Sequence, residues 1–546
     1  MAPSTASHNR PPLPSQKTTP QVLSQTLRQT RPIQLFRFGS RRVLVVASPS
    51  LAEECLTTND ITFANRPHLL AGKYLGYNYT SLVFAPYGDH WRNLRRVSTV
   101  EILSSYRLRE FEPIRADEVV RMVRKLYRSS FKEATEAREN LCRSQLYQKK
   151  GFFLGPTLKK ILKVQRKLRE ICYLCMLNLI SELHGFSVTE VVQVKQFLAD
   201  LTLNAMMRMI SGKRYYYGVD DVLTVEEKEK ADRFQALVAE ISEVMGATNV
   251  GDYLPVLRWF GVSKLEKRLI CLQAKRDLFM QELVEELKRG LNKSAEEKKR
   301  KNLIEILLSL QKTEPECYTD EMIRSIMLVM LAGGTGTSIS TMEWAMSLLL
   351  NNPSVLIKAQ AEIDKYVGQD RLIQESDMTN LPYLGCIIKE TMRMFPPGPL
   401  LPHESAKDCK VGGYHIPCGT MLLVNVWGIQ NDPTIWGDPE TFRPERFEGL
   451  EGYRDGFKYM PFGFGRRSCP GEGMANRTVA IGLGSLIQCF EWERTTESKV
   501  DLSEGVGITM PKAINLEAIC RPRSTIGRII QEPYTFARTK EPRKSH

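Results

Sequence analysis

The stretch that most constrains this chain is residues 461–471, which reads PFGFGRRSCPG. It surrounds a single cysteine, Cys469, with three glycines and two adjacent arginines. Glycine lets a backbone turn tightly and approach a ligand closely, and a neighbouring arginine lowers the pKa of a thiol and can hold carboxylates. The apolar segment 478–487 follows, and a helix that begins just after the cysteine directs its positive end at a thiolate. The stretch therefore predicts a loop that presents a thiolate to a large, flat, acidic ligand.

Haem meets that description, because its iron accepts a cysteine thiolate and its propionates bind arginine. The alternative for Cys469 is a buried structural thiol, since cysteine is among the most buried residue types. We take that alternative for the other cysteines of the twelve in the chain. For Cys469 we favour the haem ligand, because so many consecutive positions around it suit one.

Composition narrows the class of protein. The 546 residues are 42% hydrophobic and 25% charged, which is typical of a globular chain with a large core. The net charge is +14, but no long polybasic tract with interleaved aromatics is present, so the sequence argues against nucleic-acid binding. A basic surface suits an acidic partner protein or an anionic membrane face. Scattered cysteines without a secretory signal peptide indicate a reducing compartment.

Helical periodicity dominates the chain, and strand-like pieces are few and short. We expect a polar, Pro-rich lead over residues 1–31, disordered over residues 1–21, then one domain over 32–520 and a basic tail over 521–546. Two strands joined at Gly39-Ser40 are predicted within residues 33–48, and shorter ones at 412–417 and 420–427. Helices are predicted over residues 192–210, 226–244, 264–291, 302–310, 320–350 and 384–394. No apolar run reaches 18 residues, so no transmembrane helix is predicted.

The segment 320–350 is apolar nearly all round and should be a buried helix. Its middle contains Gly333, Gly334 and Gly336. Each glycine is about 1 kcal/mol less favourable than alanine in a helix. Packing or function must therefore require these glycines.

The spacing Phe462-x-x-Gly465-x-Arg467-x-Cys469-x-Gly471 resembles the haem-binding loop of the cytochromes P-450. Four further motifs agree with that family in order and spacing, and they are Trp91-x-x-x-Arg95 of its helix C, residues 333–338 of its helix-I groove, Glu390-x-x-Arg393 of its helix K, and the PERF motif within 442–447. The resemblance covers about residues 32–520, apart from roughly 130–183. It implies the cytochrome P-450 fold in a single large domain, mainly α with a small β portion, that binds haem b.

The resemblance also implies roles for single residues. Cys469 becomes the axial ligand of the iron, within a loop completed by Phe462, Gly465 and Gly471. The haem propionates are expected to bind Trp91, Arg95, His403 and Arg467. Glu390, Arg393 and Arg446 are expected to form a buried ion network that holds the haem loop. From the residues alone, Trp91 and Arg95 could instead edge an amphipathic core, and Glu390 and Arg393 could be a surface pair.

Thr337 is the expected catalytic residue. In the family, an alcohol at this place in helix I helps to deliver protons during oxygen activation, and a hydroxyl can both donate and accept. The neighbouring glycines are expected to open the helix for oxygen and water. The alternative is a threonine bonded back to its own helix. The family usually has an acid before this threonine, but this chain has Gly336, which predicts weak monooxygenation with leakage of peroxide.

Residues 64–67 (ANRP), 212–218 (GKRYYYG) and 402–405 (PHES) resemble the plant A-type group that contains isoflavone hydroxylases. This implies a haem-thiolate monooxygenase that hydroxylates a hydrophobic small molecule, such as an isoflavonoid or phenylpropanoid. It would use O2 and NADPH–cytochrome P-450 reductase, docked near Arg466, on the cytosolic face of the endoplasmic reticulum membrane. The substrate pocket is expected to be lined by residues 68–84, 330–334, 398–401 and 505–509.

Two departures from the family remain. Plant members carry an apolar anchor before a Pro-rich hinge, and the lead of this chain has the hinge remnant at residues 10–14 without the anchor. Residues 130–183 are a basic insert where the family passes directly between two helices. We interpret both as signs of an imperfect gene model, with a functional insert as the alternative. The alternative functions are a haem-thiolate dehydratase or isomerase, and a degenerate non-catalytic relative.

Overall fold

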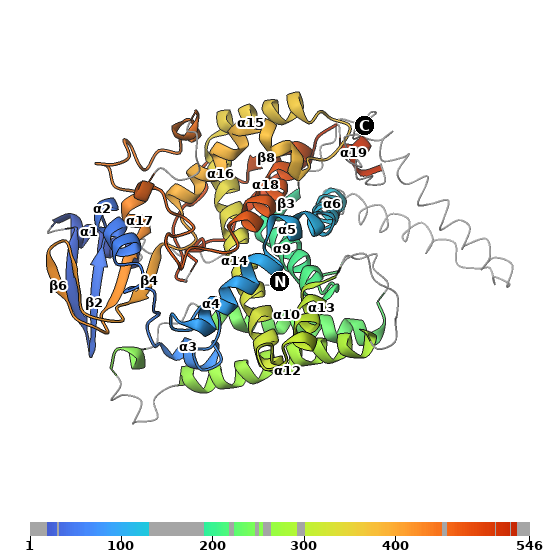
Figure 1. Cartoon of the computed structure of the whole chain (residues 1–546). Helices are drawn as coiled ribbons and strands as arrows, with labels where there is room; N and C mark the ends of the chain where they lie inside the picture. The colour runs from blue at the N-terminus through green and yellow to red at the C-terminus, as the bar shows by residue number, and fades with distance from the viewer. Residues whose placement is uncertain are drawn as a thin grey trace, which may run out of the picture.

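The computed structural model describes residues 19–29, 32–129, 190–217, 223–245, 250–254, 264–291, 301–449, 456–507, 509–524 and 526–531. The predicted insert at 130–183 lies outside these residues, as do most of the predicted tail and the first part of the lead. The fold is mainly α with a small β portion, as the sequence predicts (Figure 1).

Helices form most of the described chain. They are α1 Thr19–Gln29, α2 Pro49–Glu53, α3 Leu70–Tyr74, α4 Asp89–Arg96, α5 Ser105–Glu110, α6 Glu112–Ser129, α9 Val194–Ser211, α10 Val225–Met245, α12 Lys264–Leu291, α13 Leu303–Thr313, α14 Asp320–Asn351, α15 Pro353–Tyr366, α16 Pro382–Met394, α17 Val426–Gln430, α18 Glu472–Cys489 and α19 Ile526–Gln531. Short π-helical turns continue α2 (Glu54–Thr58) and α4 (Val97–Ile102), and a 3-10 turn covers Pro444–Phe447.

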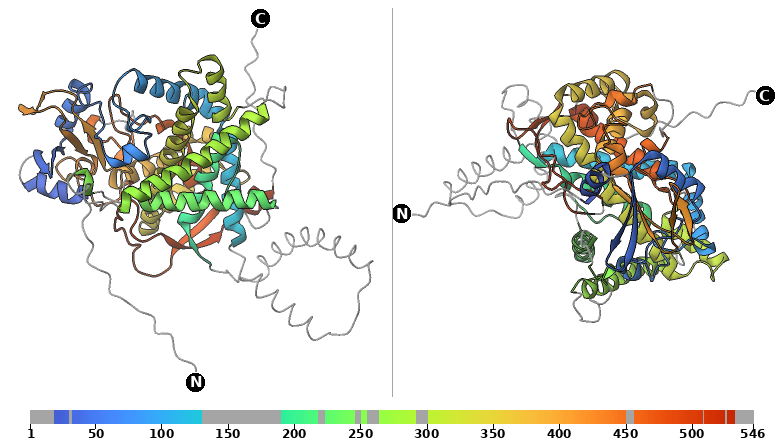
Figure 2. Two further views of the ribbon diagram at one scale, coloured as in Figure 1. Left: turned by 90° about the horizontal axis from the view of Figure 1, so that it is seen from below. Right: turned by 90° about the vertical axis from the view of Figure 1, so that its left-hand side faces the viewer.

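The strands form three small sheets. They are β1 Ile33–Phe38, β2 Arg41–Val46, β3 Glu190–Gln193, β4 Leu400–Glu404, β5 Cys409–Val411, β6 Tyr414–Ile416, β7 Met421–Asn425, β8 Phe490–Arg494 and β9 Glu517–Pro522. The largest sheet has the order β1-β2-β7-β4, and its β2–β7 pair is parallel. The others are β3-β9-β8 and β5-β6. Figure 2 shows the largest sheet at one side of the helical body.

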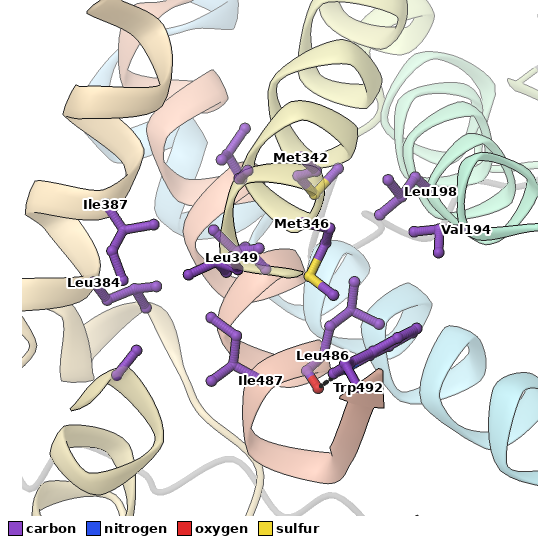
Figure 3. Packing of buried hydrophobic residues seen from close by; sticks show 14 of the residues in the cluster. Val194, Leu198, Met342, Met346, Leu349, Leu384, Ile387, Leu486, Ile487 and Trp492 are labelled. Carbon is purple, nitrogen blue, oxygen red and sulfur yellow. Dashed lines mark hydrogen bonds between the residues drawn. The ribbon is translucent and has the colours of Figure 1, made fainter. Parts of the chain in front are cut away.

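The long central helix α14 organises the core. Its buried side chains pack against α9, α16 and α18, and Figure 3 shows Met342, Met346 and Leu349 between Leu198 of α9 and Leu384 of α16. By length and composition alone, α14 is also the one helix among the described residues that could cross a membrane. Its place at the centre of the core accounts for that composition.

Several predicted elements are confirmed closely. The hairpin turns at Gly39-Ser40, where Gly39 has a φ of 59°. The predicted helix over 264–291 matches α12. Ser48 caps α2 by accepting a hydrogen bond from the Leu51 N–H, as a serine before a helical proline predicts.

Other predictions were wrong. Residues 19–21, expected to be disordered, belong to α1, because Leu23 of that helix buries its side chain beside Val43 and Val45 of β2. The Asn425 side chain also donates to the Pro20 carbonyl at 3.0 Å. Val192 was expected in a helix but lies in β3, paired with Ala518 of β9. Regular structure also continues past the expected boundary at residue 520, since β9 runs to Pro522 and α19 follows it.

Candidate functional site

The cysteine loop is a tight turn closed by backbone hydrogen bonds. The Cys469 N–H donates to the Phe462 carbonyl at 2.8 Å, and the Ser468 N–H donates to the Gly465 carbonyl at 3.1 Å. Gly463 and Gly465 have φ values of 68° and 70°, in the left-handed region that favours glycine. The sequence therefore folds here as predicted, into a loop that ends where α18 begins at Glu472.

Gly465 also packs closely against the protein itself. A Cβ built on it would lie 2.5 Å from Oδ1 of Asp60 and 2.7 Å from the Leu56 carbonyl. Glycine is therefore required here by the close approach to the segment after α2. The neighbouring Arg466 N–H donates to the same Asp60 carboxylate at 3.1 Å, and the Arg466 Nε lies 3.2 Å from its Oδ2.

The Cys469 thiol is solvent-accessible, unlike the thiols of Cys55, Cys489 and Cys520. Densely packed surroundings raise its pKa, and this outweighs the lowering by the backbone N–H groups of Gly471 and Glu472 and by Arg95. The arginine that lowers the pKa of Cys469 is therefore Arg95 of α4 and not one of the two adjacent loop arginines, and its effect is not dominant. A cation that binds the sulfur directly would favour the thiolate over the thiol.

An accessible stretch interrupts the buried face of α14. Ala332 and Gly333 are exposed in the middle of this core helix. A Cβ built on Gly333 or Gly336 would meet no atom within 4 Å. Met474 of α18, five residues after Cys469, packs against Gly334. The accessible thiol lies just before α18, and α18 packs against the accessible stretch of α14.

Gly334 has the opposite surroundings from its neighbours, because a Cβ there would collide with the Met206 side chain of α9. Gly334 is therefore closely packed, whereas Gly333 and Gly336 face open space. The expectation that they open the helix was wrong, since α14 is a continuous α-helix from Asp320 to Asn351. An opened helix would lose backbone hydrogen bonds between adjacent turns, and a continuous α-helix keeps them.

Thr337 adopts the alternative considered from the sequence. Its hydroxyl donates to the Gly333 carbonyl at 2.8 Å, one turn back in its own helix. The hydroxyl oxygen keeps its capacity to accept a hydrogen bond. The catalytic role of Thr337 stays a prediction.

A cluster of partly buried cations lies beside the cysteine loop. Arg467 donates to the carbonyls of Ala64 at 2.7 Å and Ala85 at 2.5 Å, and its guanidinium lies 4.3 Å from the Trp91 ring. Arg95 donates to the Ser468 carbonyl at 2.5 Å. Burial, together with Arg66 and Arg95, lowers the pKa of Arg467 to about 9. These side chains have no carboxylate within 4 Å among the described residues.

Arg66 is the functional residue that sequence reasoning missed. Its Nε is buried without a hydrogen-bond partner among the described residues, and burial lowers its pKa to about 10. One of its other nitrogens donates to the Pro402 carbonyl. A buried donor without a partner is costly, and an acidic ligand would satisfy it. The available signal was a lone arginine in the stretch FANRPHLL.

His403 completes this cluster as a neutral ring. Its Nδ1 lies 2.8 Å from the Phe63 carbonyl, and because a carbonyl only accepts, Nδ1 carries the proton. Burial first, then Arg66 and Arg467, lower the pKa of His403 to about 3. Its Nε2 is therefore an acceptor beside the arginines.

These features fit haem. Partly buried arginines without a carboxylate suit the two propionates of the cofactor, and an accessible cysteine suits its iron. Arg66, Arg95 and Arg467 would hold the propionates, and Cys469 would hold the iron.

The predicted ion-network residues meet in the structure. Arg393 donates to Glu390 at 2.7 and 3.0 Å, and the Nε of Arg446 lies 3.2 Å from the same carboxylate. The side chains of Glu390 and Arg393 are fully buried. Arg393 also donates to the Gln430 carbonyl at 2.9 Å, and the Gln430 side chain accepts the N–H of Met460 at 2.9 Å. The network therefore reaches the residue directly before the cysteine loop.

The remaining predicted residues are less informative. Phe462 is partly buried and packs against the core around α14. A Cβ on Gly471 would make an ordinary contact of 3.7 Å with the Cys469 sulfur, so the described atoms do not require glycine there. In the predicted pocket segment 398–401, the side chain of Leu401 packs against Gly463 and Gly398.

Comparison with known proteins agrees with this geometry. The chain matches the family model described as Cytochrome P-450 over residues 11–141 and 140–516. It is 44% identical to an isoflavone 3'-hydroxylase of Medicago truncatula over 485 residues, which cover 89% of this chain and 84% of that protein. It is 43% identical to a (+)-piperitol/(+)-sesamin synthase of Sesamum radiatum over 503 residues, covering 92% and 86% of the two chains.

Solved structures show the same fold. A zebra fish cytochrome P-450 with progesterone superposes with a TM-score of 0.69 at 22% sequence identity, covering 93% of this chain and 100% of that one. The family match, the relatives and the cysteine loop lead to one conclusion: this chain belongs to the cytochrome P-450 family, whose cofactor is haem b.

Proposed function

We propose that this protein is a monooxygenase that hydroxylates a hydrophobic plant metabolite of the isoflavonoid or phenylpropanoid type. The observation that carries the haem-thiolate part is the accessible Cys469 beside partly buried arginines that lack a carboxylate. The substrate class rests on relatives named as isoflavone hydroxylases.

The proposed division of roles follows from the contacts of each side chain. When bound, the haem supplies the oxygen and electron chemistry, and a cysteine ligand favours O–O cleavage. Arg66, Arg95 and Arg467 hold its carboxylates, and Trp91 fixes Arg467 through its ring. Thr337 holds a proton next to the open space beside Gly333 and Gly336.

We propose NADPH–cytochrome P-450 reductase as the electron donor, docked beside the cysteine loop. Arg466 is about half exposed there, with a guanidinium free enough to meet an acidic partner while it pairs with Asp60. The exposed side chains of Val100 and Tyr106 follow α4, which supplies Arg95. A basic surface with apolar side chains suits a transient contact with an acidic flavoprotein.

A contact with the endoplasmic reticulum membrane is supported by an apolar surface at the β1–β2 hairpin. Leu35, Phe38 and Leu254 are 50%, 37% and 43% exposed. Phe38 meets Tyr253 edge-on at 6.2 Å, which joins the hairpin to the segment after α10. The exposed Arg37 and Arg42 lie among them. Apolar side chains flanked by arginines suit the interface of an anionic membrane.

The test is reconstitution of the purified protein with the reductase and a panel of plant phenolics that includes isoflavones. We expect a thiolate-type Soret band in the reduced, CO-bound spectrum and a hydroxylated product that requires both NADPH and O2. A product that forms without either would favour the dehydratase or isomerase. Absence of the thiolate band would show a degenerate relative.

A further inference from the structure

Residues 500–507 and 509–513 form a hairpin that is fastened to α14 next to Thr337. Ser340 and Trp344 follow Thr337 by one and two turns and so lie on the same face of the helix. The Ser340 hydroxyl lies 3.4 Å from the Met510 carbonyl, and the Trp344 Nε1 donates to that carbonyl at 3.0 Å. The Met510 carbonyl therefore lies about one helical turn, roughly 5.4 Å along the axis, from Thr337.

The hairpin has a defined internal structure. The Gly505 N–H donates to the Pro511 carbonyl at 2.7 Å, and Glu504 bridges Lys512 in antiparallel fashion. Met510 has a φ of 46°, a conformation that side-chain-bearing residues adopt only when their surroundings fix it. The contacts from Ser340 and Trp344 supply that fixation at the Met510 carbonyl.

Lys512 lies at the base of this hairpin as a buried amine. Its side chain is 5% exposed, its Nζ donates to the Asp501 carbonyl, and that nitrogen lies 4.6 Å from the centroid of the Trp344 ring. No carboxylate lies within 4 Å of the Nζ among the described residues. A desolvated ammonium is attracted to an indole face.

The charged groups around Lys512 come from three elements. Asp501 and Glu504 belong to the hairpin, Glu343 belongs to α14, and Lys195 of α9 lies 3.9 Å from the Glu343 carboxylate. Burial lowers the pKa of Lys512 to about 8, and Glu343 and Asp501 oppose that shift. The ammonium is therefore present at neutral pH and is lost in a moderately alkaline range.

Trp344 also contacts a second segment. Its ring stacks on Phe395 at 3.8 Å with an interplanar angle of 2°. Phe395 directly follows α16 and precedes the turn 396–399 that leads into β4. One buried indole thus fastens both the hairpin tip and the turn before β4.

We propose that Lys512 is a positioning residue that, through Trp344, sets the placement of residues 505–507, 509–510 and 396–399 and thereby selects the ligands that enter beside the haem. This inference rests on the proposed function, because it takes these two segments to line the substrate pocket. Lys512 itself touches neither substrate nor cofactor.

The test compares two azoles that bind haem iron, the small imidazole and the larger 4-phenylimidazole, by spectral titration of the holoprotein. In Lys512→Met, we expect the Kd of 4-phenylimidazole to rise about tenfold, equivalent to about 1.4 kcal/mol. The Kd of imidazole should stay within about twofold, because a small azole does not reach the two segments. Lys499→Met, at an exposed lysine before the same hairpin, is the matched control and should leave both affinities unchanged.

A second experiment uses the wild-type protein and Lys512→Arg, so it does not depend on Lys512→Met. As pH rises from 7 to 9, the wild-type affinity for 4-phenylimidazole, expressed per neutral azole, should fall relative to that for imidazole. Lys512→Arg keeps its charge over this range and should show a flat ratio. If Lys512→Met does not incorporate haem, this experiment decides, and a wild-type ratio that is also flat overturns the proposal. Equal changes for both azoles in Lys512→Met overturn it too.

The isoflavone daidzein separates this inference from the proposed function. If daidzein gives neither a spectral shift nor a product while the azoles respond as expected, the substrate class is wrong and the positioning role stands. If daidzein is hydroxylated and Lys512→Met behaves like Lys499→Met, the function stands and the positioning role is wrong.

Discussion

Arg467 and Trp91 donate to one backbone oxygen, the carbonyl of Leu82, at 3.3 and 3.1 Å. The guanidinium also lies over the Trp91 ring. A desolvated cation over an indole gains about 2 kcal/mol. The pair therefore joins α4 to the cysteine loop through the segment that precedes α4, and it fixes Arg467 before any carboxylate binds.

Replacing Arg66 should affect the protein in opposite directions with and without haem. Arg66→Met removes a buried cation with an unsatisfied Nε, so the haem-free protein should gain about 1–3 kcal/mol of unfolding free energy. The haem content of the purified protein should fall, because a propionate partner is lost. Reduced CO spectra and thermal unfolding measure the two effects, and Arg466→Met, about half exposed, is the control. A haem content equal to wild type would contradict the role of Arg66.

Gly336→Asp should restore coupling of electron use to product. A side chain fits, because a Cβ on Gly336 meets no atom within 4 Å. The new carboxyl group would supply the acid that the family usually has before this threonine, so less peroxide should form per NADPH consumed. Thr337→Ala should change the ratio in the opposite direction. Unchanged peroxide and product yields in Gly336→Asp would show that the missing acid does not limit this protein.

Gly465→Ala should destabilise the protein more than Gly413→Ala. Both glycines have left-handed φ values, 70° and 82°, so each substitution carries backbone strain of about 1–2 kcal/mol. Only at Gly465 would the new methyl also collide with Asp60 and the Leu56 carbonyl. Overpacking adds about 1–3 kcal/mol. Thermal unfolding of the two variants measures the difference, and equal losses would mean that the segment after α2 yields freely.

Glu390→Gln should cost about 3–5 kcal/mol of unfolding free energy, because it leaves the fully buried Arg393 without its anion. Asp89→Asn breaks the exposed pair with Arg92 and should cost less than about 1 kcal/mol. Denaturant unfolding of both variants tests this. A small loss in Glu390→Gln would mean that the Gln430 and Pro439 carbonyls, which Arg393 also contacts, are sufficient partners.

Lys512 should give the stability an identifiable pH dependence. Its pKa is about 8 in the folded protein and about 10.4 when unfolded, so the unfolded chain binds more protons between these values. The unfolding free energy should therefore rise with pH from 8 to about 10.4, by up to about 3 kcal/mol. Lys512→Met should lack this rise while being more stable than wild type below pH 8. Parallel pH profiles for the two proteins would contradict the burial of the charge.

The sequence predicted elements whose signal is local. The 3.6-residue period set the bounds of α12, and Gly39-Ser40 set the first hairpin. The prediction failed where contacts with residues far along the chain determine the local structure. Helix α1 reads as polar, but Leu23 is covered by strands that include Met421, nearly 400 residues later. Val192 joins a strand because its partner is Ala518.

The same distinction holds at the site. Cys469 and the Glu390–Arg393 pair carry local spacing signals, so they were predictable. Arg66 was not, because its importance depends on Arg467 and His403, which lie near it only in the folded protein. Spacing could not show that Gly465 packs on Asp60 or that Thr337 bonds to Gly333.

The parallel pairing of β2 with β7 has a consequence for synthesis. Val46 pairs with Val424, so the inner edge of the first hairpin stays without a partner until the ribosome has made most of the chain. At about 5–20 residues per second, that interval lasts roughly 20–75 s. An apolar strand edge exposed for so long can pair with other nascent chains. Chaperone supply during translation should therefore limit the yield of this protein in a heterologous host.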